Sequence, residues 1–252
     1  MRVTASQIVE WANSHAKEAQ TELPRWVRKL CFQSGSTSEI AFPAGDSAYR
    51  PGWDGRLYSD QGNAWVPTGV SCWEIGCDAN ARDKANREYD RRTEGTDPTE
   101  RANTTFVFVT PRRWLKKVEW IAAQRRNARW ADIKVWDADD LEQWLEQSSA
   151  VALQFAEFLG LLGPGVESLE RYWLRWSGQC SPTITKEAFF TDRAAICKQI
   201  ETLARETVES GAGSSVTLKA DSEEEATAFA VARAGLSPNR QPTRHWLSSL
   251  RP

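Results

Sequence analysis

Histidine is almost absent from this chain of 252 residues, which has only His15 and His245, near its opposite ends. That scarcity excludes zinc sites of the H-E-x-x-H type, serine or cysteine triads that depend on histidine, and histidine-based metal sites. No G-x-x-x-x-G-K-[ST] motif occurs either, and the short run SGAGSS lacks the lysine of a phosphate-binding loop. Any catalysis is therefore expected to use carboxylates, lysine, tyrosine or a lone cysteine, and a small-molecule enzyme is disfavoured.

Long apolar runs are also missing. No stretch approaches the roughly 20 apolar residues that span a bilayer, and the N-terminus has no apolar core of a signal peptide. The cysteines are odd in number and show no C-x-x-C spacing, which is typical of reduced thiols. These absences predict a cytoplasmic protein with no membrane partner. The five cysteines are Cys31, Cys72, Cys77, Cys180 and Cys197.

Tryptophan, by contrast, is abundant, with 13 copies, most of which we expect to be core or interface anchors. The net charge is only −2, but residues 82–129 hold nearly twice as many Arg and Lys as Asp and Glu, interleaved with Trp114, Trp120 and Trp130. This stretch is either a DNA-facing surface or the solvent-exposed faces of two helices. The charge excess favours the DNA-facing surface.

The hydrophobic periodicity predicts an α/β domain over residues 1–165, in the order helix, three strands, helix, strand, helix, strand, helix. The first helical region has two stretches, and Pro24 is placed in the first turn of the second. The run TTFVFVTP indicates a strand buried on both faces of a sheet. The expected helices are 5–20, 23–31, 79–93, 112–128, 137–147 and 151–162, and the expected strands are 39–43, 53–59, 69–77, 104–111 and 132–138.

The remaining residues, 166–252, differ in pattern. Residues 172–184 are loop-like with aromatic anchors, and residues 190–210 form an amphipathic helix. A strand over 214–220 and a further helix, begun by an Asp221–Glu224 capping box, follow. Because one strand and two helices bury little apolar surface, we interpret this part as a linker and the start of a second α/β module.

Two carboxylates occupy unusual positions in the predicted strands. Asp54 lies in "GWDG" and Glu74 in "WEIG", and antiparallel pairing of their strands would bring both to one end of the sheet. Closely spaced carboxylates repel unless a cation lies between them, and Mg²⁺ or Mn²⁺ prefers such oxygen ligands. Lys84 opens the next helix, and its spacing to Arg87 and Arg91 gives that helix a cationic face.

Each of these residues has a simpler interpretation. Asp54 before glycine is common in turns, Glu74 could form a buried salt bridge with an arginine, and Lys84 could be a solvated helix residue. Cys72 and Cys77 flank the glutamate, but without a histidine partner they are more typical of small core residues than of nucleophiles. Three further acids are possible additional ligands: Glu39, Asp46 and Asp78.

The order Asp, Glu, Lys on α-β-β-β-α-β resembles the PD-(D/E)xK restriction-endonuclease-like superfamily. That resemblance implies a fold with a helix, a three-stranded antiparallel part, a helix and further strands. It implies metal ligation by Asp54, Glu74 and the Ile75 carbonyl. The family lysine stands two residues after the second acid, where this chain has Gly76. Some members carry the lysine on the neighbouring helix, as Lys84 would.

A longer run, from "LPRWVRKL" through "FPAGDSAYRPGWDG" and "DKANREYDRRT" to "TTFVFVTPRRW", resembles nuclease domains at the N-terminus of bacterial anti-phage defence proteins. The resemblance implies an Mg²⁺-dependent DNA endonuclease, with homo-oligomers formed through a downstream NTPase or sensor module outside this sequence. The alternative is a catalytically inactive nuclease-fold module that binds nucleic acid or a protein partner. The expected DNA-binding residues are Arg87, Arg91, Arg112 and Arg113.

Overall fold

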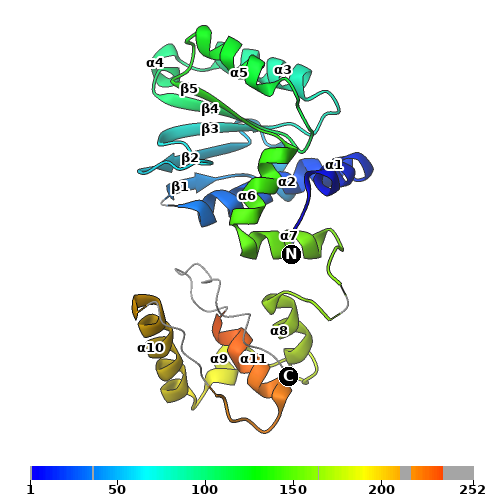
Figure 1. Ribbon diagram of the computed structural model, residues 1–252, viewed down its shortest axis with the longest axis vertical. Coiled ribbons are helices and arrows are strands. Elements are labelled where there is room, and N and C mark those ends of the chain that lie inside the picture. Colours follow the sequence, from blue (N-terminus) through cyan, green and yellow to red (C-terminus); the bar gives the residue numbers. More distant parts are fainter. Residues whose placement is uncertain (1, 36, 164, 211–216, 235–252) are drawn as a thin grey trace. The chain divides into compact units, whose positions relative to one another are not determined.

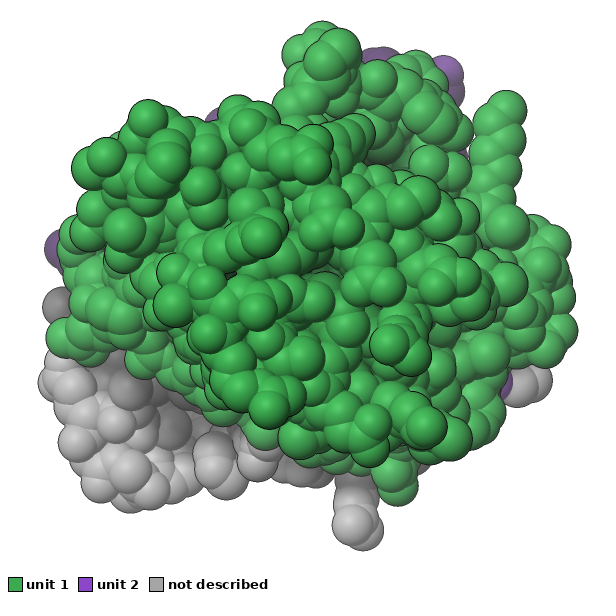
Figure 2. Space-filling model, turned by 90° about the horizontal axis from the view of Figure 1, so that it is seen from above, with its two compact units in different colours: residues 1–161 green, residues 162–252 purple. Residues whose placement is uncertain are grey.

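The computed structural model describes residues 2–35, 37–163, 165–210 and 217–234. The chain divides into two compact units, Met1–Leu161 and Leu162–Pro252 (Figure 2). The division lies four residues before the boundary predicted at residue 165. Among the described residues, no helix combines the length and the apolar character needed to cross a membrane.

Unit 1 is built on a five-stranded sheet of order β1-β2-β3-β4-β5 (Figure 1). β1 pairs with β2, and β2 with β3, in antiparallel directions, whereas β3, β4 and β5 run parallel. The predicted α/β class is thus confirmed, and β1, β2 and β3 form the expected three-stranded antiparallel part. The strands are β1 (Thr37–Ala41), β2 (Gly55–Ser59), β3 (Gly69–Ile75), β4 (Thr104–Val109) and β5 (Asp132–Trp136).

The strand register determines which side chains share a face. Cys72 lies opposite Arg56 on β2 and opposite Phe106 on β4, while Glu74 lies opposite Phe108. Since side chains alternate along a strand and paired residues point the same way, Cys72 and Glu74 project to the face that carries the two phenylalanines. All six residues of β4 are buried, as predicted for a strand covered on both faces.

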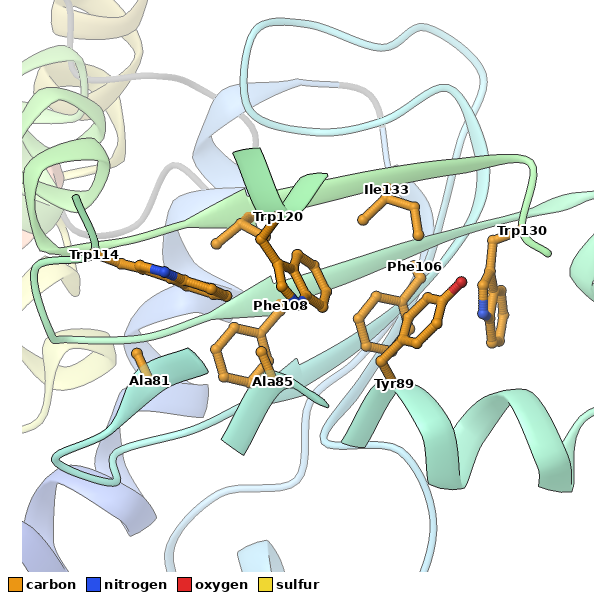
Figure 3. Close-up of a cluster of buried hydrophobic side chains, with 10 residues drawn as sticks. Ala81, Ala85, Tyr89, Phe106, Phe108, Trp114, Trp120, Trp130 and Ile133 are labelled. Atoms are coloured by element: carbon orange, nitrogen blue, oxygen red, sulfur yellow. The ribbon is translucent and has the colours of Figure 1, made fainter. Parts of the chain in front are cut away.

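Two helices, α3 (Ala81–Gly95) and α5 (Lys117–Arg126), cover that face (Figure 1). Small residues of α3 let the helix approach the sheet, and aromatic rings fill the space between (Figure 3). The three tryptophans of the basic stretch belong to this core and not to the surface. The cluster consists of Ala81, Ala85, Tyr89, Phe106, Phe108, Trp114, Trp120, Trp130, Ile133 and Val135.

The second N-terminal helix and α6 pack on the opposite face of the sheet, and the first N-terminal helix and α7 pack against these two. The chain turns at His15, which ends the first helix and begins the second. Pro24 was expected in the first turn of the second helix. That helix begins earlier, directly after His15, so Pro24 is buried in its interior. A short helix, α4 (Pro98–Arg101), precedes β4. The bounds are α1 (Ala5–Ser14), α2 (Ala16–Ser34), η1 (Gly45–Tyr49), α6 (Ala138–Gln147) and α7 (Ser149–Phe158).

The helix expected over 112–128 is shorter than predicted. The Trp114 amide donates to Asp137 Oδ2 at 3.0 Å, which holds the preceding residues outside the helix. α5 therefore begins at Lys117. Val118, an apolar residue of this helix, is exposed.

Within the described residues, the regular secondary structure of unit 2 is entirely helical. Of the stretch predicted as loop-like, residues 172–177 are helical, because Trp173 packs inward against Phe189 in a core cluster that also contains Phe229, whereas residues 178–184 are not helical. Residues 217–220 form no strand, so the described part of unit 2 does not show the predicted α/β extension; residues 214–216 of that expected strand lie outside the described residues. The helices are α8 (Leu169–Ser177), α9 (Lys186–Phe190), α10 (Ala194–Ser210) and α11 (Glu223–Ala234).

Candidate active site

Asp54 stands immediately before β2, at the point where its ladder with β3 ends at the pair Gly55 and Trp73. Beyond that pair, the Asp54 side chain takes the place of a main-chain carbonyl as partner of the Ile75 amide. Its Oδ2 accepts a hydrogen bond of 2.8 Å from that amide. Continuing the register places Asp54 opposite Glu74, on the same face. The sequence-based expectation that antiparallel pairing brings Asp54 and Glu74 to one end of the sheet is met.

Glu74 is fully buried and forms ion pairs with two arginines of α3. Its Oε1 accepts from Arg92 Nε at 2.5 Å, and its Oε2 lies 3.3 Å from Arg91 Nη2. The Arg92 guanidinium also lies over the Trp53 ring, 4.5 Å from its centroid. The salt bridge that was the simpler interpretation of Glu74 is therefore present in this structure.

Lys84 lies in the first turn of α3, directly beside the end of β3. A Cβ atom at Gly76 would lie 2.6 Å from Lys84 Cγ and 2.7 Å from Phe108 Cζ, so the glycine leaves the space that the lysine stem occupies. Gly76 stands where the PD-(D/E)xK pattern has its lysine. Here the missing side chain at Gly76 makes room for the side chain of Lys84. The Lys84 ammonium lies 2.7 Å from Glu88 Oε1 and 4.0 Å from Asp78.

Glu88 is the acidic residue of this cluster that the sequence analysis missed. It is buried on α3, one turn after Lys84, and also forms an ion pair with Arg91. The helical period that turns Ala85 and Tyr89 inward places position 88 near the same stripe. A glutamate at a core-facing helix position is unusual in the same way as Glu74 in its apolar strand, so the helical pattern could have identified Glu88.

The electrostatics of the cluster favour added positive charge. Burial, followed by the charge of Asp54, raises the pKa of Glu74 to about 8, although Arg92 acts in the opposite direction. Burial also raises the pKa of Asp54, opposed by the Ile75 amide and by Lys84. Burial of Glu88 would raise its pKa too, but Lys84 and Arg91 outweigh it and lower that pKa.

The donor set fits a hard divalent cation. Asp54 and Glu74 offer carboxylate oxygens, and an environment that raises the pKa of both stabilises a proton or a metal ion there. Within the part of the chain that the structure describes, no group of three or more His, Cys, Asp or Glu side chains is arranged to hold a metal. The expected set consists of two such side chains and the Ile75 carbonyl.

The predicted DNA-contacting arginines fall into two groups. Arg87 and Arg91 are largely exposed on α3, and Arg87 lies 3.3 Å from Asp78. Arg113 is half-exposed and pairs with Asp139 at 3.1 Å. Arg112, by contrast, is buried, and its guanidinium donates to the main-chain carbonyls of Cys77 and Ala12. Arg112 therefore joins α1 to the end of β3, and we assign it a structural role in place of the expected DNA contact.

The other candidate residues lie at different distances from the cluster. Asp78 is beside Lys84, whereas Glu39 is exposed on β1 and Asp46 is exposed in η1. Cys72 and Cys77 are buried, and burial raises the pKa of their thiols to about 11 and about 12 respectively. Thiols that stay protonated are poor nucleophiles, which agrees with their interpretation as small core residues.

Comparisons of this chain with protein-family models, with curated proteins and with solved structures find no match.

Replacing Arg112 by methionine should lower the free energy of unfolding by about 2–4 kcal/mol, because buried main-chain carbonyls lose their donors. Arg113→Met, the adjacent exposed position, is the control and should cost less than about 1 kcal/mol. Urea unfolding measures both values. An Arg112→Met protein of unchanged stability that has lost DNA affinity would support the original prediction of Arg112 as a DNA contact.

The raised pKa of Glu74 predicts a pH-dependent stability. Between pH 4.5 and about 8 the folded protein binds a proton that the unfolded chain has released, so this contribution is complete below pH 4.5 and is lost as the pH rises through about 8. Relative to Glu74→Gln, the wild type should lose on the order of 1–4 kcal/mol across this window in EDTA. Parallel stability curves for the two proteins would contradict the assignment.

Proposed function

We propose that unit 1 is a restriction-endonuclease-like domain that hydrolyses DNA phosphodiester bonds with Mg²⁺ or Mn²⁺. The observation that carries the proposal is the meeting of Asp54 and Glu74 on one face, both with raised pKa values, beside Lys84. Isolated buried carboxylates destabilise a fold, and their convergence at the end of a sheet is typical of a functional site. A role as an anti-phage effector rests on the sequence resemblance.

In this proposal Asp54, Glu74 and the Ile75 carbonyl hold the metal ion. The N–H and C=O groups of one strand residue point to the same side, so an Ile75 amide that donates to Asp54 implies a carbonyl directed toward the same region. A bound divalent ion would acidify a water molecule and neutralise charge on the phosphate. Glu74 must loosen its ion pairs with Arg91 and Arg92 to take part.

Lys84 supplies a fixed positive charge next to these ligands. An ammonium at this position stabilises negative charge that develops on a scissile phosphate. The exposed Arg87 and Arg91 extend the positive face along α3 and would attract the DNA backbone. Arg113 stays a candidate backbone contact, because its side chain is half-exposed.

A second function, binding without catalysis, is favoured by one specific observation. Glu74 is fully paired with Arg91 and Arg92, and Lys84 is paired with Glu88, so the cluster is already a connected ion-pair network. Such a network stabilises the junction of β3 and α3 without a metal. The same fold would then serve as an inactive module that binds nucleic acid or a protein partner.

Metal binding and cleavage separate these two functions. Asp54→Asn and Glu74→Gln should each weaken Mn²⁺ binding at least about tenfold and lower plasmid nicking at least about a hundredfold, since each removes a charged ligand. Asp60→Asn, an exposed position after β2, is the control and should behave as wild type. Calorimetry measures binding, and gel electrophoresis measures nicking.

Undiminished nicking by either variant would contradict the metal assignment. A wild-type protein that binds DNA but neither binds Mn²⁺ nor nicks plasmid would support the inactive module. Loss of folding in both variants would show that the ion pairs of Glu74 are structural.

The packing of Gly76 against Lys84 gives a test of the lysine assignment. Gly76→Ala should lower turnover because its Cβ displaces the Lys84 stem, and it should cost less turnover in a Lys84→Ala background, where only the close contact with Phe108 remains. Gly95→Ala is the control, because a Cβ there has nothing within 4 Å. A double-mutant cycle on nicking rates measures the coupling. Additive losses from Gly76→Ala and Lys84→Ala would contradict this role of Lys84.

A further inference from the structure

Glu88 is a buried acid that the proposed metal site does not use. Its carboxylate contacts the Lys84 ammonium at 2.7 Å and pairs with Arg91. Burying a carboxylate costs several kcal/mol unless it is paired. A glutamate that served only to keep the helix surface polar would be exposed. The buried position of Glu88 on α3 therefore needs another explanation.

Lys84 is restrained at two points along its side chain. Its Cγ passes over Gly76 at the end of β3, where a Cβ atom would lie only 2.6 Å away. Its ammonium is held by Glu88 one turn later on α3. A free lysine has four rotatable side-chain bonds, and fixing them in advance removes an entropic cost from the step that uses the charge.

We propose that Glu88 is a positioning residue that holds the Lys84 ammonium beside Asp54 and Glu74. This inference rests on the proposed nuclease function. Glu88 acts through Lys84 and is not itself a metal ligand, because its carboxylate is directed to Lys84 and Arg91. Its removal would leave Lys84 charged but mobile, so that ground-state binding of DNA survives while stabilisation of the transition state is lost.

Three predictions for Glu88→Gln follow from this role. Turnover should fall about tenfold or more with the KM for DNA within about twofold, since only the transition-state contact is weakened. Mn²⁺ affinity should stay within about fivefold of wild type, unlike that of Asp54→Asn. In a Lys84→Ala background the same substitution should cost no further turnover. Glu88→Asp keeps the charge and should give an intermediate turnover, and Glu94→Gln, an exposed acid of the same helix, is the control.

A readout independent of cleavage is the rate at which acetic anhydride modifies Lys84, followed by peptide mass spectrometry. A lysine released from its ion pair reacts faster, so Glu88→Gln should increase the labelling of Lys84 about tenfold while Lys116 stays unchanged. Equal labelling of Lys84 in both proteins would overturn the positioning role. A loss of Mn²⁺ affinity as large as that of Asp54→Asn would overturn it in favour of a third ligand.

The two proposals fail in different ways. A wild-type protein without Mn²⁺ binding or nicking overturns the nuclease function and, with it, the catalytic purpose of Glu88. Labelling of Lys84 would then decide whether the contact with Glu88 positions the lysine at all. Normal wild-type cleavage with Glu88→Gln indistinguishable from Glu94→Gln overturns the positioning role alone.

Discussion

Burial of the Glu74 carboxylate beside Asp54 is the interaction on which the rest of the site depends. Burial raises the pKa of both acids, and the charge of Asp54 raises that of Glu74 further; the fold offsets this with Arg91, Arg92 and Lys84, all from α3. Glu88 pairs with Lys84 and Arg91, and Gly76 leaves the space that the Lys84 side chain occupies. The close packing of α3 on the sheet through small residues is therefore also what completes the charged cluster.

Most of the fold of unit 1 could be predicted because its strands and helices have strong periodic signals. The apolar run of β4 and the Gly- and Pro-bounded strands before it were found in the right order. Errors arose where tertiary contacts override local preference. Pro24 lies inside α2, with buried residues before and after it. Asp137 delays the start of α5, and Trp173 draws the first part of an expected loop into α8.

The site was predictable in part, for reasons that differ between residues. Asp54 and Glu74 were visible because acids are unusual in half-buried strands, and their meeting followed from antiparallel pairing. Glu88 and Arg92 were missed because charged residues on a helix are common, and only the packed structure shows which of them face inward. Arg112 was misassigned for the same reason, since its sequence neighbours give no sign of the carbonyls of Cys77 and Ala12 that it contacts.

The central claim is that the acid pair holds a divalent metal ion, with the arginines as its counter-charges when no metal is bound. The most direct measurement is anomalous diffraction from crystals soaked in Mn²⁺. The account predicts a peak bounded by Asp54, Glu74 and the Ile75 carbonyl, with the Arg92 guanidinium moved away from Glu74. No peak at saturating Mn²⁺, with Arg92 still bonded to Glu74, would contradict it.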